Sequence, residues 1–332
     1  MKSLILKKKE KMDLRDITSR NLDSMEVAIQ VKACGICGTD VHIFHGKPGS
    51  AEVTFPIVLG HELAGEVIEV GKEVSNFKVG DRVAVDPNIY CQKCSYCRSG
   101  KIHLCSNLQA IGVTRDGGMQ EVCHIPEANA YLLPQEVSYE EGALVEPLSC
   151  VLHGIKKIDL SPTQEILIVG GGFIGQLFLQ LIAKRGLKNI TVCEVDEMKK
   201  EQLFEFGANK VINPLEEKDF NQEFDVVIEC VGRKETMEIA LNNIKKGGQL
   251  LVFGVSSPEM KVEIKPYEIF QKELRIFGSF INPNTVLEAI SLINTKEIQV
   301  SPLISHKFKL EEIEHVLANY PSYRITKGII LI

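Results

Sequence analysis

The chain has 332 residues, a length that favours two domains over one. Hydrophobic residues make up 44% of it and charged residues 25%, as in ordinary globular proteins, and the formal net charge is −6. This acidic balance argues against nucleic acid or an anionic membrane as the main partner. No apolar run reaches the ~18 residues of a membrane span, and the lysines at positions 7–9 interrupt any export signal. Ten cysteines in such a chain indicate metal ligation in a reducing, cytoplasmic compartment.

The first part of the chain, residues 1–150, is expected to be rich in β-strands. Glycines and prolines separate short apolar runs throughout this part, a pattern typical of a partly closed barrel or sandwich. The runs that predict strands are 4–8, 27–32, 65–70, 82–86, 121–125 and 130–133.

From about residue 139 the pattern changes to alternating helices and strands, which predicts an α/β domain with a doubly wound parallel sheet. The expected strands are 165–169, 190–194, 211–213, 225–230, 250–254 and 274–280. The expected helices are 140–157, interrupted at Pro147, then 174–185, 199–206 and 236–244, the last closed by Gly247 and Gly248. The tail, with helices 286–293 and 310–317 and strands 304–308 and 329–332, is expected to return to the first domain. We therefore predict one domain from residues 1–150 and 284–332 and a second from 151–283.

A glycine-rich turn follows the buried strand 165–169. Gly170, Gly172 and Gly175 have the spacing of a dinucleotide-binding fingerprint, and Phe173 and Ile174 open the helix behind them. The first glycine permits the tight turn, the second admits the pyrophosphate, and the third allows close packing of helix on strand. The N–H groups of the helix start would hold the pyrophosphate.

An acidic residue follows the fingerprint at the expected distance. Glu194 ends the second strand, where a carboxylate binds the ribose hydroxyls of NAD and repels the extra phosphate of NADP. Asp196 is a neighbouring candidate for the same role. Lys199 and Lys200 leave NADP open, because they could bind a phosphate if Glu194 turned away.

Four cysteines form a compact cluster in one short stretch. Cys91, Cys94, Cys97 and Cys105 have the spacing C-x2-C-x2-C-x7-C, which favours a closed, structural zinc site with four thiolates. The alternative is four reduced cysteines without metal.

Three further segments carry residues with metal-binding and catalytic chemistry: residues 37–42 (CGTDVH), 60–74 (GHELAGEVIEVGKEV) and 142–147 (GALVEP). Together with the four-cysteine cluster, they resemble the zinc-dependent medium-chain alcohol dehydrogenases over essentially the whole chain. The Glu146-Pro147 pair resembles the polyol branch of that family, which includes sorbitol dehydrogenase.

The resemblance implies a GroES-like catalytic domain and a Rossmann domain, with an active site between them. Cys37 and His61 would bind a catalytic zinc ion, with Glu62 as a ligand or as a partner of the ligands. Glu146 would bind the metal directly or through its water. One coordination position must stay open for the substrate oxygen.

The mechanism implied by the resemblance moves a hydride from a secondary alcohol to NAD. The alcohol proton would leave through Thr39 and the nicotinamide ribose, with His42 as the exit to water. Plainer interpretations stand beside these roles. Thr39 could cap a helix that begins near Asp40, and His42 could be an ordinary surface residue. Glu62 could be a solvated charge, and Glu146 could be a carboxylate at a helix start.

The substrate is expected to be a polyol or sugar alcohol, in free or phosphorylated form. Ile281 and Asn282 stand where sorbitol dehydrogenases have an Arg-Tyr pair, and Ile43 stands where an aromatic residue is common. Arg115 could bind a substrate phosphate or lie in a surface turn. The alternatives are oxidation of an amino alcohol, as in threonine dehydrogenases, and an NAD- and zinc-binding protein without turnover. The resemblance also implies a homodimer or homotetramer formed through the Rossmann sheets. The apolar segments 250–253, expected as an edge strand, and 274–280 could pair across such an interface or be buried within one subunit.

Overall fold

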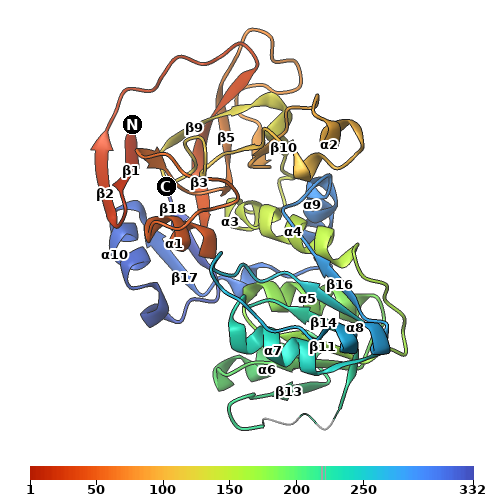
Figure 1. The fold of residues 1–332 in the computed structure, drawn as a ribbon. Coiled ribbons are helices and arrows are strands. Elements are labelled where there is room, and N and C mark those ends of the chain that lie inside the picture. Colours follow the sequence, from red (N-terminus) through yellow and green to blue (C-terminus); the bar gives the residue numbers. More distant parts are fainter. Residues whose placement is uncertain (218–219, 221) are drawn as a thin grey trace. The chain divides into compact units, whose positions relative to one another are not determined.

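The computed structural model describes residues 1–217, 220 and 222–332. The chain forms two compact units: unit 1 comprises Met1–Ser149 and Asn282–Ile332, and unit 2 comprises Cys150–Ile281 (Figure 1). In the part of the chain that the structure describes, every helix is too short or too polar to cross a membrane.

Unit 1 is organised around a seven-stranded sheet in which β3 (Glu26–Ile36) is the central strand. It is rich in β-branched and small apolar residues that lie buried on both faces, and Val27, Ile29 and Val31 belong to the main hydrophobic core. The sheet order is β10-β6-β5-β3-β18-β17, with β9 also paired to β3. The bounds are β5 (Glu62–Val70), β6 (Arg82–Val85), β9 (Val122–Pro126), β10 (Ala130–Leu132), β17 (His306–Lys309) and β18 (Gly328–Leu331). The C-terminal tail therefore supplies two strands of this sheet.

Two smaller sheets and several short helices complete unit 1. The sheets have the orders β2-β1-β4 and β7-β8. Their strands are β1 (Lys2–Lys8), β2 (Lys11–Asp16), β4 (Ile57–Val58), β7 (Asn88–Ile89) and β8 (Gln109–Ala110). The helices are α1 (Gly38–Phe44), α2 (Ser95–Arg98), α3 (Tyr139–Ala143), α9 (Val286–Asn294) and α10 (Ile313–Ala318), and α4 (Val145–Ile155) runs from unit 1 into unit 2.

The helix predicted at 140–157 is split, but not at Pro147. Ser138 caps α3 by accepting a hydrogen bond from Glu141 N at 3.2 Å, and α3 ends before Leu144. Pro147 lies in the first turn of α4, where a proline is tolerated because the N–H it lacks has no partner within the helix.

Unit 2 contains a six-stranded parallel sheet of order β13-β12-β11-β14-β15-β16, which confirms the doubly wound α/β prediction. The strands are β11 (Ile166–Val169), β12 (Ile190–Cys193), β13 (Lys210–Ile212), β14 (Phe224–Glu229), β15 (Ile244–Val252) and β16 (Arg275–Gly278). The helices packed on this sheet are α5 (Phe173–Lys184), α6 (Lys200–Glu205), α7 (Lys234–Asn242) and α8 (Pro266–Lys272) (Figure 1).

Two details of unit 2 differ from the sequence prediction. Gly247 and Gly248 do not close a helix but lie inside β15, where the pairing with β14 is irregular. Residues 250–253 do not form an edge strand, because β15 lies between β14 and β16. The edge strand on this side of the sheet is β16, and the helix α8 before it was not predicted.

A buried polar network lies in unit 1 at the two points where the chain passes to and from unit 2. Asn282 donates to Ser149 Oγ at 2.7 Å, and these two residues are the ends of the unit 1 segments. Asn88 donates to Asn282 Oδ1 at 2.6 Å and to Asp86 Oδ1 at 3.2 Å. Burial raises the pKa of Asp86 to about 6, although hydrogen bonds from Asn88 and Asn282 oppose the shift. The carboxyl group is therefore held where its charge is poorly solvated.

This raised pKa makes a prediction about stability. The folded protein holds the Asp86 proton more tightly than the unfolded chain, so the contribution of Asp86 to stability falls as pH rises through about 4 to 6. Between pH 5 and pH 7 the wild type should lose about 1 kcal/mol of unfolding free energy relative to Asp86→Asn. Urea unfolding at the two pH values measures this difference. Asp81→Asn, a change at a partly exposed carboxylate, is the control, and equal pH dependence of wild type and Asp86→Asn would contradict the prediction.

Candidate metal centres and dinucleotide site

The structure brings together three of the predicted metal ligands in unit 1. Cys37 caps the start of α1, His61 precedes β5, and Glu62 is the first residue of β5. One ligand atom from each of the three lies within 4.8 Å of the others. A glycine at position 35 of the adjacent strand β3 makes this possible, because a Cβ there would collide with the Glu62 carboxylate.

Asp40 organises this group from α1. Its carboxylate is fully buried and accepts hydrogen bonds from Cys37 N at 2.8 Å and from Gly60 N at 3.2 Å. Its Oδ1 lies 3.5 Å from His61 Nδ1. Burial alone would lower the pKa of His61, but the charges of Asp40 and Cys37 raise it well above its usual value. Asp40 was not among the predicted site residues, although its place in the CGTDVH segment was a signal for it.

Lys327 is a second residue that the sequence analysis missed. It is 4% exposed, its ammonium group pairs with the Glu62 carboxylate, and it donates to Ile36 O at 3.1 Å. Burial alone would lower the pKa of Lys327, but the charges of Glu62 and Cys37 raise it. Lys327 comes from the segment before β18, and no motif in that segment points to it.

The three ligands fit a catalytic zinc ion by their chemistry and surroundings. A thiolate, an imidazole and a carboxylate are all zinc ligands, and three protein ligands leave one position open. The buried His61 Nδ1 faces the Asp40 carboxylate at 3.5 Å, an arrangement in which a carboxylate orients the ring of a metal-binding histidine.

Three other predicted site residues lie near the ends of helices. Glu146 is buried in the first turn of α4 and lies outside the three-residue group, as far as the described residues define it. Thr39 lies inside α1, whose cap is Cys37, so it does not cap a helix as the plainer interpretation supposed. His42 is partly buried in the last turn of α1, and burial, followed by the charges of Lys47 and His45, lowers its pKa.

The four cysteines of the predicted cluster converge around α2. One sulfur from each of Cys91, Cys94, Cys97 and Cys105 lies within 4.8 Å of the other three. The sulfurs of a four-thiolate zinc site are about 3.8 Å apart, because each Zn–S bond is about 2.3 Å long. Backbone N–H groups of Cys97 and Ser106 lower the pKa of Cys94 to about 6, which favours a thiolate there. The cluster therefore fits a structural zinc ion.

In unit 2, the fingerprint glycines occupy the turn between β11 and α5. Gly170 has a φ of 106°, which favours glycine, and Gly172 caps α5. A Cβ at Gly175 would collide with the carbonyl of Gly170. Phe173 and Ile174 are the first two residues of α5, so their N–H groups lie at the positive end of the helix.

Glu194 lies directly beside this turn. A Cβ at Gly171 would be 3.1 Å from its Oε2, and its Oε1 accepts hydrogen bonds from Val195 N and Asp196 N, both at 2.9 Å. Lys199 pairs with Glu194 Oε2 at 3.3 Å. The competing candidate Asp196 instead accepts a hydrogen bond from Met198 N at 3.1 Å.

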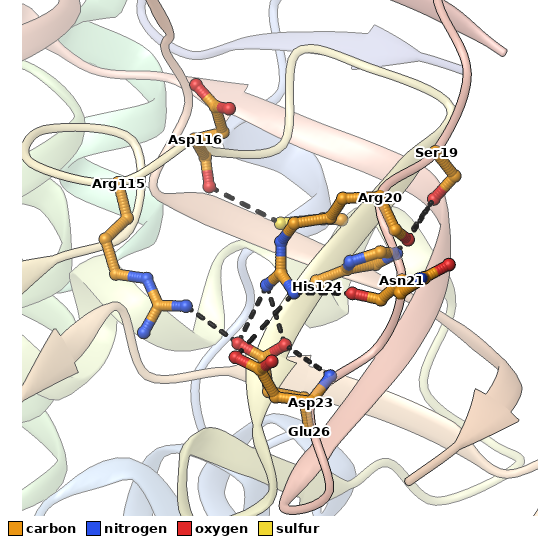
Figure 2. A network of polar contacts seen from close by, with 9 residues as sticks. Ser19, Arg20, Asn21, Asp23, Glu26, Arg115, Asp116 and His124 are labelled. Atoms are coloured by element: carbon orange, nitrogen blue, oxygen red, sulfur yellow. Dashed lines mark hydrogen bonds and ion pairs between the residues drawn. The ribbon is translucent and has the colours of Figure 1, made fainter.

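Three residues considered for substrate binding are occupied in other ways. Arg115 pairs with the buried Glu26 at 2.7 Å, and Arg20 pairs with the same carboxylate (Figure 2). Ile43 is fully buried in the core of unit 1, and Asn282 is fully buried in the network around Asp86. A substrate phosphate bound by Arg115 would therefore have to displace an ion pair.

Comparison with known proteins finds a matching domain family for each of two parts of the chain. Residues 23–135 match the alcohol dehydrogenase GroES-like domain, and residues 174–295 match the zinc-binding dehydrogenase domain. D-arabinitol dehydrogenase 1 from Uromyces fabae is 32% identical over 92% of this chain and 90% of its own. An L-threonine 3-dehydrogenase from Shewanella baltica is 32% identical over 95% of this chain and 94% of its own. The crystal structure of a zinc-binding dehydrogenase from Sinorhizobium meliloti bound to NADP has 34% identity and a TM-score of 0.95, covering 100% of this chain and 99% of that one.

The chain belongs to the zinc-dependent medium-chain alcohol dehydrogenase family and, within it, to the polyol branch. Its fold combines a GroES-like, β-rich part with a Rossmann part, as the sequence predicted.

The Glu62–Lys327 pair yields a prediction about stability. Lys327→Met leaves a buried carboxylate without its cation, so it should lower the unfolding free energy of metal-free protein by about 3–5 kcal/mol. The double variant Lys327→Met, Glu62→Gln should recover most of this loss. Urea unfolding followed by circular dichroism measures both.

The matched control is Lys2→Met, because Lys2 pairs with Glu311 at 3.0 Å with both side chains about half exposed. Its loss should be far smaller than that of Lys327→Met, because water screens an exposed ion pair. If Lys327→Met is no more destabilising than Lys2→Met, the buried pair does not have the role assigned to it.

Proposed function

We propose that this protein oxidises a secondary alcohol of a polyol or sugar alcohol to the ketone, with NAD as hydride acceptor. The observation that supports this most directly is the convergence of Cys37, His61 and Glu62, whose ligand atoms lie within 4.8 Å of one another. We further propose that unit 1 is the catalytic domain and unit 2 the dinucleotide-binding domain.

In this proposal Cys37 and His61 hold the catalytic metal, and Glu146 binds it directly or through its water. Zn²⁺ bound there would act as a Lewis acid that lowers the pKa of the substrate hydroxyl. Lys327 neutralises Glu62 and so favours Glu62 as a partner of the site over Glu62 as a permanent ligand. Cys91, Cys94, Cys97 and Cys105 would hold the structural zinc ion.

We assign proton removal to Thr39 and His42. They are three residues apart on α1, so their side chains lie on the same side of the helix. The Thr39 hydroxyl would accept the proton of the substrate hydroxyl as it donates its own. His42, whose lowered pKa keeps it neutral near pH 7, would accept the proton and release it to water.

We propose that the turn from Gly170 to Gly175 binds the pyrophosphate of the dinucleotide and that Glu194 binds its adenosine ribose. The N–H groups of Val195 and Asp196 and the Lys199 ammonium hold this carboxylate in place, which supports NAD over NADP. The related dehydrogenase that binds NADP keeps the alternative open to test.

Two alternative functions have support of their own. The threonine dehydrogenase relative supports oxidation of an amino alcohol. An NAD- and zinc-binding protein without turnover would need the same two groups of metal ligands. The presence of Thr39 and His42, which such a protein would not need, argues for an enzyme.

We also propose a cytoplasmic location, because no disulfide joins any of the ten cysteines, all of which the structure describes. Finding the protein in an oxidising compartment would contradict this.

The function is tested by metal content and turnover together. Cys37→Ser should reduce zinc from two ions per chain to one and lower kcat by at least about 1,000-fold, because the catalytic ligand set is broken. Cys34→Ala, at a buried cysteine outside the ligand group, should keep both ions and most activity. A Cys37→Ser protein with near-normal turnover would refute the proposal.

The substrate class is tested with the wild type. A panel of polyols, their phosphates and threonine, each with NAD and with NADP, should give the highest kcat/KM for an unphosphorylated polyol with NAD. Threonine as the best substrate would establish the first alternative, and no turnover in a fully metallated protein would support the second.

For the oligomer, we propose a homodimer or homotetramer formed through the edge of the unit 2 sheet. β16 is an edge strand, and on the adjoining α8 Tyr267 is 68% and Phe270 77% exposed. Phe270→Asp should shift the mass measured by light scattering to that of one chain, whereas Leu215→Asp, at another exposed apolar residue of unit 2, should not. A wild type with the mass of one chain would exclude this assembly.

A further inference from the structure

A buried carboxylate in unit 2 has no part in the site described so far. Glu229 is the last residue of β14 and is fully buried. It is in register with Val169, the last residue of β11, and with Val252, the last residue of β15. The strand order reverses between β11 and β14, and sheets of this kind bind their ligands outside the strand ends at that point.

The Glu229 carboxylate gathers the donors of the turn that follows it. Its Oε1 accepts hydrogen bonds from Val231 N at 2.9 Å, Gly232 N at 2.8 Å and Thr236 Oγ1 at 2.8 Å. Its Oε2 accepts a second one from Gly232 N at 3.1 Å. Hydrogen bonds to an ionised acceptor are about twice as strong as neutral ones. The charge therefore fixes the turn 230–232 and the start of α7.

The same residue also fixes the neighbouring turn after β15. Its backbone carbonyl accepts hydrogen bonds from Phe253 N at 3.0 Å and Gly254 N at 2.9 Å. A Cβ at Gly254 would be 2.6 Å from Glu229 Oε2, so the carboxylate fits beneath this turn only because residue 254 is glycine.

The turn 230–232 lies against the fingerprint. Cys230 N donates to Val169 O at 2.9 Å, directly before Gly170. A Cβ at Gly170 would be 2.5 Å from Val231 Cγ2, so the two turns are in van der Waals contact. A change in the position of Val231 would therefore change the packing against Gly170.

We propose that Glu229 is a positioning residue for the dinucleotide. It touches no cofactor atom itself, and it acts by holding the turn 230–232 against Gly170. This inference rests on the proposed dinucleotide site of unit 2 and adds to it a residue that neither the fingerprint nor Glu194 includes. An amide in place of the carboxylate would lose the charge, and with its oxygen in place of Oε1 it would put an N–H₂ group against the Gly232 N–H, which now donates to Oε2 as well.

The test compares Glu229→Gln with a matched control in the full-length, zinc-loaded protein. NADH binding is measured by the change in NADH fluorescence, and the Kd of Glu229→Gln should rise by about 10- to 100-fold. KM for NAD should rise with it, while kcat at saturating NAD stays near the wild-type value. The control is Glu127→Gln in unit 1, because the Glu127 carboxylate likewise accepts backbone N–H groups, from Ser75 at 2.8 Å and Asn76 at 2.6 Å.

The outcomes separate this inference from the proposed function. If the wild type binds neither NADH nor NADPH, the proposed function fails before any variant is measured. If the wild type binds NADH and Glu229→Gln binds it as tightly as Glu127→Gln does, the positioning role is wrong and the function stands. If Glu229→Gln does not fold, Thr236→Val removes one of the donors, and an unchanged Kd for NADH in that variant overturns the inference equally.

Discussion

The structure of the metal site depends on neutralising a buried negative charge. Glu62 is 1% exposed, and one of its carboxylate oxygens lies within 4.8 Å of ligand atoms of Cys37 and His61. Separating such charges from water costs several kcal/mol each unless a cation compensates them. Lys327 is the cation that pairs with Glu62, and the pairing of β18 with β3 places it there. The return of the C-terminal tail to unit 1 is thus an electrostatic requirement of the site as well as a matter of sheet pairing.

How much the sequence could predict depended on whether the interacting residues are close along the chain. The four-cysteine cluster and the fingerprint from Gly170 to Gly175 are local, so their spacing alone indicated their geometry. Lys327 could not be found in this way, because its partner Glu62 lies in a distant segment and an isolated lysine near a strand is usually exposed. Glu229 was not predicted either, because it interacts with backbone N–H groups, which every sequence contains and no motif marks.

Local rules misled where tertiary packing overrode them. Gly247 and Gly248 resemble the end of a helix, but they lie in a strand whose irregular pairing with β14 accommodates them. Pro147 resembles a helix breaker, yet it lies in the first turn of α4, where it disturbs no bond. Asn282, at a position considered for substrate contact, is instead fully buried among amide, hydroxyl and carboxyl groups of unit 1.

The contact between Ser149 and Asn282 has a consequence for how the chain folds. Their hydrogen bond joins the two residues of unit 1 that directly precede and follow the segment forming unit 2. The entropy of closing a loop grows only with the logarithm of its length, so this segment weakens unit 1 far less than its size suggests. Unit 2 can in turn be regarded as an inserted module with adjacent ends, which is the arrangement that lets one domain be lengthened, exchanged or transplanted while its host keeps its own core.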